Sequence, residues 1–135
     1  MKLLLYEYEM HLRVLQNLSM DISLDRWMSL EYQIDHIWAQ AALSAGNDFQ
    51  EYLECGNKLG NLAVVPAQTN AAMYNMNFSH KRVWYKESPF ESLKLIAEGT
   101  SWRRSEINRR TSEICNFAMK RWAMPRYNVV ERIRQ

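Results

Sequence analysis

The stretch Leu30-Glu31-Tyr32-Gln33-Ile34-Asp35-His36-Ile37 gives the most direct indication of the fold of this chain. Its apolar residues alternate with polar ones up to Asp35, which is the pattern of a half-buried strand. A second β-prone run, from Leu59 to Val65, ends at Pro66. The apolar residues between 71 and 84 recur at spacings that one helix or two short helices accept. We therefore expect the local order strand, loop, strand, helix.

This segment contains a carboxylate, an imidazole and two carboxamides. They belong to Asp35, His36, Asn61 and Asn70. Carboxylate and amide oxygens are hard donors that suit Mg²⁺ or Mn²⁺, and imidazole accepts protons near neutral pH. An Asp-His pair alone also occurs by chance, as surface groups or as a histidine hydrogen-bonded in a core. The surrounding strand, loop, strand, helix order favours the catalytic interpretation, a small metal-dependent phosphodiesterase.

The Asp-His pair sets a geometric condition on the first strand. Neighbouring residues of a regular strand point to opposite faces, so Asp35 and His36 share one site only if the strand bends or ends there. We therefore predict a distorted strand terminus at these two residues, and a straight ladder through both would count against the site.

These residues resemble the HNH (ββα-metal) nuclease superfamily, and most closely the C-terminal nuclease domain of GmrSD-like modification-dependent (type IV) restriction enzymes. The resemblance covers roughly residues 3–122. The family commonly has a proline two residues after the isoleucine that corresponds to Ile37. This chain departs from that pattern, because Ile37 is followed by Trp38-Ala39. The matching segments read Asp35-His36-Ile37-Trp38-Ala39-Gln40, Leu59-Gly60-Asn61-Leu62, Asn70, and Phe78-Ser79-His80-Lys81-Arg82.

The resemblance implies an α+β, mostly helical fold, in which a ββα-metal core of a short two-stranded antiparallel sheet and a helix is embedded among additional helices. We expect one HNH-type domain over residues 1–135, with an N-terminal helix over 1–18, the core over 30–87, C-terminal helices over 88–122 and a tail over 123–135. In the C-terminal part, Ser88-Pro89-Phe90-Glu91 predicts a helix cap, and the helix should stop at Gly99.

By the same resemblance, His36 is the expected general base, and Asp35 and Asn70 are the expected ligands of one Mg²⁺ or Mn²⁺ ion. Asn61 joins the catalytic set as a support that fixes the loop and orients the imidazole. Hydrolysis of a DNA phosphodiester is the expected reaction.

Four further residues are candidates for contacts to nucleic acid. Lys81 and Arg82 follow Asn70 closely, so we expect them to project from the helix that carries it and to offset phosphate charge. Gln40 and Trp38 lie beside the Asp-His pair in the sequence. A tryptophan can stack on a base, although large aromatic side chains more often fill a core.

The net charge of +2 conceals an asymmetry. Residues 1–79 contain 4 Lys or Arg against 9 Asp or Glu, a balance of −5, and residues 80–135 contain 13 against 6, a balance of +7. A basic half downstream of the proposed site favours DNA as the partner, although for any single residue a solvated helix face is the alternative. The basic residues concerned are Lys81, Arg82, Lys86, Arg103, Arg104, Arg109, Arg110, Lys120 and Arg121.

The two cysteines and the apolar segments bear on the setting of the protein. Cys55 and Cys115 form no Cys-x-x-Cys pair, so we expect no structural zinc and a reduced, cytoplasmic location. Glu7 cuts short the apolar start of the chain, and no segment approaches the roughly 20 apolar residues that cross a bilayer. We therefore expect neither a signal sequence nor a membrane partner.

The sequence thus predicts a metal-dependent DNA endonuclease, and the resemblance implies the effector domain of a restriction or anti-phage defence system. In GmrSD-like enzymes this domain usually follows a nucleotide-binding sensor domain. The sequence contains no Gly-rich phosphate loop, so a separate sensor domain or subunit is an expected partner. Two alternatives stay open: a non-catalytic nucleic-acid-binding module on the same fold, and a helical protein-interaction domain.

Overall fold

The structure, a computed structural model, describes residues 1–40 and 48–123. Apart from its first residue, the tail expected over 123–135 lies outside the described residues. The elements in chain order are α1 (Lys2–Leu15), α2 (Leu24–Met28), β1 (Tyr32–His36), α3 (Phe49–Cys55), the short 3₁₀ helix η3 (Leu59–Asn61), β2 (Leu62–Pro66), α4 (Ala67–Met73), α5 (Phe78–Lys86), α6 (Glu91–Glu98) and α7 (Arg104–Arg121).

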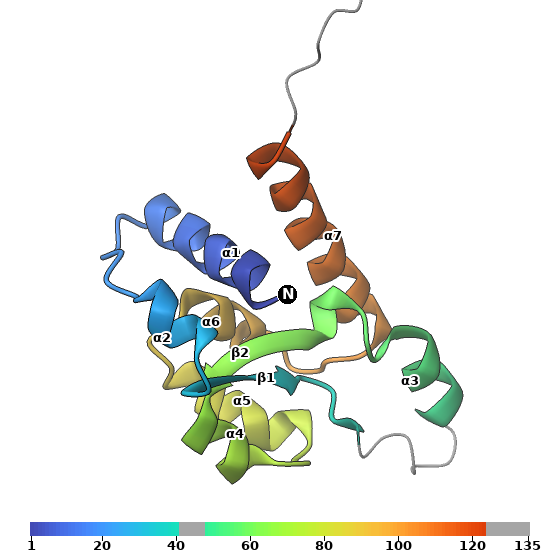
Figure 1. Ribbon diagram of the computed structural model, residues 1–135. Helices are drawn as coiled ribbons and strands as arrows, with labels where there is room; N and C mark the ends of the chain where they lie inside the picture. Colours follow the sequence, from blue (N-terminus) through green and yellow to red (C-terminus); the bar gives the residue numbers. More distant parts are fainter. Residues whose placement is uncertain (41–47, 124–135) are drawn as a thin grey trace, which may run out of the picture.

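The two strands lie between helices, with α1 and α7 on one side and α4 and α5 on the other (Figure 1). β1 pairs with β2 in antiparallel register, from Tyr32 opposite Pro66 to His36 opposite Leu62. α4 follows β2 directly and packs against both strands. The predicted strand, loop, strand, helix order and the α+β, mostly helical fold are therefore confirmed.

The core forms where β2 meets the surrounding helices. β2 contacts α1 as well as α4, so side chains on both of its faces are buried. A strand buried on both faces is a continuous apolar run, as β2 is. α1 buries one stripe, Leu5, Tyr8 and Leu12, at helical spacing. None of the helices within residues 1–40 and 48–123 is both long and apolar enough to cross a membrane.

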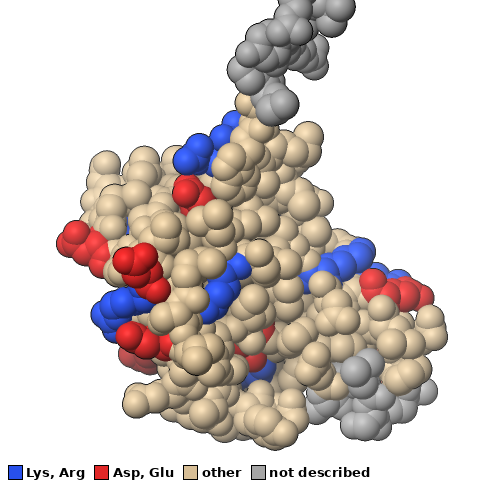
Figure 2. Space-filling view, in the orientation of Figure 1, with Lys and Arg blue, Asp and Glu red and all other residues tan. Residues whose placement is uncertain are grey.

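Basic side chains from the second half of the chain pair with acidic side chains from the first half. On the face shown in Figure 2, Lys and Arg lie beside Asp and Glu rather than in a separate basic area. The acidic half therefore neutralises part of the expected basic half, which reduces the charge available to a phosphate backbone. The ion pairs between the halves join Lys81 to Asp35, Arg103 to Asp48 and Glu51, Arg104 to Glu54, and Arg121 to Glu7.

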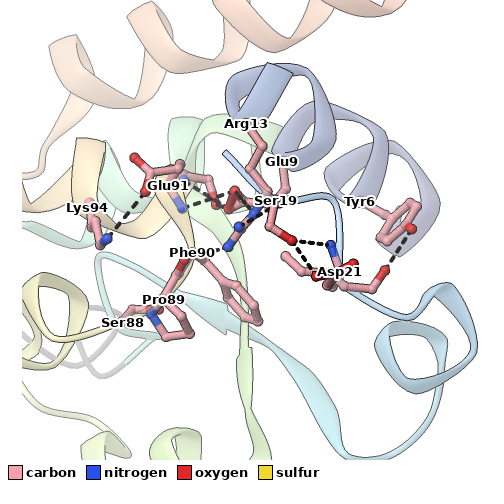
Figure 3. Close-up of polar contacts among 12 residues, drawn as sticks. Tyr6, Glu9, Arg13, Ser19, Asp21, Ser88, Pro89, Phe90, Glu91 and Lys94 are labelled. Atoms are coloured by element: carbon pink, nitrogen blue, oxygen red, sulfur yellow. Dashed lines mark hydrogen bonds and ion pairs between the residues drawn. The ribbon is translucent and has the colours of Figure 1, made fainter. Parts of the chain in front are cut away.

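The N-terminus of α6 is capped by a distant side chain. The backbone N–H groups of Glu91 and Ser92 each donate to a carboxylate oxygen of Glu9, on α1, at 3.0 Å (Figure 3). The cap predicted at Ser88 is wrong, because the helix begins only at Glu91 and Glu9 satisfies its free N–H groups. Burial raises the pKa of Glu9, and these hydrogen bonds oppose that shift. The predicted stop is confirmed, since Gly99 is the C-terminal cap.

α7 holds η3 in place at the start of β2. Arg110 is buried and donates to the carbonyl oxygens of Gly60 at 3.1 Å and Leu62 at 2.7 Å. Its inclusion among the residues facing DNA was wrong, because its guanidinium group binds backbone carbonyls inside the protein. Burial lowers the pKa of Arg110 to about 10, so the group stays charged at neutral pH. Gly60 packs so closely that a Cβ atom would lie 2.0 Å from the Ile107 carbonyl oxygen.

Candidate active site

A cavity of about 210 Å³ lies at the end of β1, beside α4 and α5; we call it the catalytic cavity. The expected ligands and base, Asp35, His36 and Asn70, all line it, and so do Gln40 and Lys81. The fold thus brings together residues from β1, from the loop after it and from two helices. The other lining residues are Gln33, Ala39, Ala71, Tyr74 and Asn75.

Asp35 is held by two side chains from α5. Its Oδ1 atom accepts a hydrogen bond from Lys81 Nζ at 2.7 Å, and its Oδ2 atom accepts one from the Tyr85 hydroxyl at 2.5 Å. Lys81 Nζ also donates to the His36 carbonyl oxygen at 2.6 Å. Asp35 is 4% exposed and Lys81 1% exposed, so this ion pair is almost dry. Burial, together with the charge of Asp35, raises the pKa of Tyr85 well above its usual value.

The predicted distortion of β1 is wrong. Asp35 and His36 lie in a regular ladder, opposite Ala63 and Leu62, so their side chains leave opposite faces of the strand. β1 does end at His36, as predicted, and both residues line the catalytic cavity. A bend in the backbone is therefore not required to bring the carboxylate and the imidazole to one site.

His36 is half-buried, and its imidazole contacts a side chain from a distant loop. Its Nε2 atom lies 3.1 Å from Oδ1 of Asn57, in the segment between α3 and η3. An imidazole that donates through Nε2 keeps a lone pair on Nδ1 and can accept a proton there. This arrangement suits a general base.

Asn61 is fully buried and fixes the loop that follows β1. Its Oδ1 atom accepts from the Trp38 N–H at 2.8 Å, while its Nδ2 atom donates to the carbonyl oxygens of Trp38 at 3.1 Å and Gly56 at 2.8 Å. Its own carbonyl oxygen accepts from the Ile37 N–H at 2.9 Å. These bonds hold the backbone after His36, but none of them reaches the imidazole.

Asn70, on α4, has its carboxamide oriented by a neighbour on β1. Its Nδ2 atom donates to Oε1 of Gln33 at 2.9 Å. Its Oδ1 atom accepts no hydrogen bond from the residues that the structure describes, so this oxygen is available to a cation.

The donor set fits a hard divalent cation held through two protein oxygens. Asp35 and Asn70 line the same cavity, and Mg²⁺ commonly binds few protein oxygens while keeping several waters. Within residues 1–40 and 48–123, no group of three or more His, Cys, Asp or Glu side chains could hold a metal ion. The remaining coordination positions would therefore fall to water and substrate. The ammonium group of Lys81, 2.7 Å from Oδ1 of Asp35, repels any cation at this carboxylate, which limits the number of cations that the site can hold.

Comparison with known protein families identifies the family of this chain. The family described as "GmrSD restriction endonucleases, C-terminal domain" matches residues 2–117. The chain belongs to this family. No match was found among the curated proteins or the solved structures. The resemblance inferred from the Asp-His-Ile and Leu-Gly-Asn-Leu segments is thereby confirmed, and the chain is a domain of the restriction-endonuclease class.

In this GmrSD C-terminal domain, Lys81 and Arg82 lie on α5, whereas Asn70 lies on α4. The prediction that one helix carries all three is wrong, because α4 ends and a second helix begins between them. Lys81 points into the catalytic cavity and not toward solvent. Arg82 Nε donates to the carbonyl oxygen of Ala97, near the end of α6, at 2.7 Å. Arg82 thus joins α5 to α6.

Trp38 and Gln40 lie on the segment that follows β1 in the GmrSD C-terminal domain. Trp38 is half-buried, with the ring of Tyr52 edge-on at 5.1 Å and the guanidinium of Arg103 at 4.2 Å from its ring centroid. Gln40 is exposed at the edge of the catalytic cavity. Both positions are therefore open to a ligand in that cavity or next to it.

Three residues of the site were not predicted from the sequence. Gln33 is two residues before Asp35 on β1, and Tyr85 is one helical turn after Lys81, so the periods of strand and helix could have indicated both. Asn57 lies in an irregular segment, where no periodicity predicts the direction of a side chain.

Proposed function

We propose that this domain is an HNH-type endonuclease that hydrolyses DNA phosphodiester bonds with the help of one divalent cation, Mg²⁺ or Mn²⁺. The observation that carries the proposal is the shared cavity, where a candidate base, His36, lies with two candidate oxygen ligands, Asp35 and Asn70. Membership of a restriction-endonuclease family supports the same reaction class.

In the proposed reaction His36 removes a proton from the attacking water. Its contact with Asn57 supports proton acceptance at Nδ1, and Asn61 holds the backbone on which the imidazole is mounted. Lys81 and Tyr85 keep the Asp35 carboxylate in one orientation. The ammonium group of Lys81 is also positioned to offset negative charge that develops on a phosphate in the cavity.

Asp35 and Asn70 would hold the cation. When bound, it supplies Lewis-acid activation of the phosphate and stabilises the charge of the departing oxygen. Gln33 keeps the Oδ1 atom of Asn70 available, because it occupies the Nδ2 side of the same carboxamide.

The family also supports a biological setting for the proposed activity. We propose that the domain is the effector of a restriction or anti-phage defence system, acts in the cytoplasm, and works with a nucleotide-binding sensor domain or subunit. The sequence supplies no phosphate-binding glycine loop of its own, so such a sensor would lie outside these residues.

One observation favours a second candidate, a non-catalytic DNA-binding module on the same fold. Both carboxylate oxygens of Asp35 already accept hydrogen bonds, from Lys81 and Tyr85. A site whose anion is neutralised in this way attracts a cation less strongly than a free carboxylate does.

A plasmid assay separates the two candidates. The purified domain is incubated with supercoiled DNA in Mg²⁺, in Mn²⁺ and in chelator, using plain and base-modified plasmids. We expect nicked or linear product with at least one of the two ions and none with chelator. DNA binding without cleavage under all these conditions would contradict the endonuclease and support the binding module.

A further inference from the structure

A second cavity, of about 500 Å³, adjoins the catalytic cavity; we call it the side cavity. The two cavities share Ala39 and Asn75 in their walls. A molecule that places a phosphate in the catalytic cavity therefore has a neighbouring space within reach of the same strand.

Aromatic side chains form much of the side cavity. Trp38, Phe78 and Trp102 line it, and the rings of Phe78 and Trp102 lie 5.8 Å apart between centroids. Trp102 is 2% exposed, and its Nε1–H has no hydrogen-bond partner among the described residues.

Polar groups next to these rings are available to a ligand. The carboxamide of Asn75 makes no hydrogen bond to the described residues, so it can both donate and accept at the edge of a planar ligand. Asn77, by contrast, caps α5 by accepting from the His80 N–H and is already in use.

The charges around the side cavity cancel. Of the described residues that line it, Arg103 and Asp48 are the charged ones, and they pair with each other at 2.7 Å. Arg103 forms a second pair, with Glu51, also at 2.7 Å. With its cation paired, the side cavity is poorly suited to a phosphate and better suited to a neutral, flat group that can stack and form hydrogen bonds.

We propose that the side cavity receives one unpaired nucleobase of the strand whose phosphate lies in the catalytic cavity. This inference rests on the proposed function and names its substrate class: DNA in which a nucleotide next to the cleaved bond is single-stranded, bulged or turned out of the duplex. The half-buried rings of Trp38 and Phe78 supply stacking, and the exposed Asn75 reads the base edge.

The test measures binding and does not depend on cleavage. In the His36→Ala background, the Kd is measured for a fully paired duplex and for the same duplex with one bulged 2-aminopurine, whose fluorescence reports stacking. We expect the bulged duplex to bind about tenfold more tightly and its 2-aminopurine to be quenched, as stacking on aromatic side chains predicts.

Two variants and a control locate the effect. Ser79→Trp fills the side cavity from an exposed position on α5, and Asn75→Ala removes a polar group without touching the core. Both should abolish the preference for the bulge, while Ser112→Trp, the same change at an exposed position on α7, should retain it. Circular dichroism confirms that each variant is folded.

Equal affinity for the two duplexes, binding to neither, or a preference that both variants retain would overturn the proposal. The proposed function fails on a different result, the absence of His36-dependent cleavage by the parent domain. The two failures are therefore distinguishable.

Discussion

At the scale of the residue, the orientation of the candidate base depends on a neighbour that no sequence pattern predicts. His36 could be predicted from the Asp-His-Ile triplet, but its contact with Asn57 could not, because that residue lies in an irregular segment. Asp35 was predicted as a ligand, yet its burial against Lys81 depends on α5 folding back onto β1, which no local pattern encodes.

Replacing Asn57 tests whether it positions the imidazole. Asn57→Ala removes the acceptor at Nε2, so the ring is free to rotate and its tautomer is no longer fixed. We expect kcat to fall about 10- to 100-fold with little change in KM, the effect typical of lost partners around functional histidines. Steady-state cleavage rates over a series of DNA concentrations measure both constants, with Asn116→Ala at an exposed position on α7 as control. Equal rates for both variants would remove Asn57 from the site.

Replacing Lys81 tests the buried ion pair. Lys81→Met leaves the Asp35 carboxylate buried without its counter-charge, which typically costs about 3–5 kcal/mol of unfolding free energy. Urea denaturation measures the loss. Lys86→Met, at an exposed position on the same helix, should change stability by less than about 0.5 kcal/mol. If the two variants are equally stable, Lys81 does not hold the interior together as described.

At the scale of the element, periodicity predicted the sheet but not every helix end. The alternation before Asp35 and the apolar run before Pro66 became β1 and β2. The start of α6 was predicted two residues or more too early, because its free N–H groups are satisfied by Glu9 of α1. A cap supplied from the far end of the chain leaves no local signal.

The turn into β2 gives a test at this scale. Gly60→Ala would place a Cβ atom 2.0 Å from the Ile107 carbonyl oxygen, so η3 must move away from α7. We expect a loss of about 1–3 kcal/mol or more, as in overpacked cores. Gly99→Ala is the matched control, since its Cβ would meet no heavy atom closer than 3.5 Å. Thermal unfolding of both variants measures the difference, and equal stability would contradict the close packing of η3.

At the scale of the whole molecule, ion pairing changes the expectation for DNA binding. The charge balance of the two halves could be read from the sequence, but the pairing of Arg103, Arg104 and Arg121 with acidic partners depends on the tertiary fold. Arg110 is buried and therefore contributes no charge to the surface. The basic half therefore offers DNA fewer free charges than its composition suggests.

This distribution of charges predicts that the affinity for DNA depends only modestly on salt concentration. If all nine basic residues named above contacted phosphates, the slope of log K against log salt would be about −8. We expect a slope shallower than about −4, because part of that set is paired or buried. Fluorescence anisotropy of the His36→Ala variant with a fixed duplex, over a series of salt concentrations, measures it. A slope near −8 would show that the ion pairs open when DNA binds.

The proposed function requires that the catalytic cavity is the active site. The most direct test compares the rate of plasmid nicking by His36→Ala with that by His11→Ala. His11 lies on α1 with its ring tilted against that of Phe117, and it does not line the cavity, so it is a matched histidine outside the catalytic cavity. We expect His36→Ala to lower the rate by at least about 100-fold, as loss of a general base does, and His11→Ala to cut at the parental rate. Parental cleavage by a folded His36→Ala domain would contradict the account.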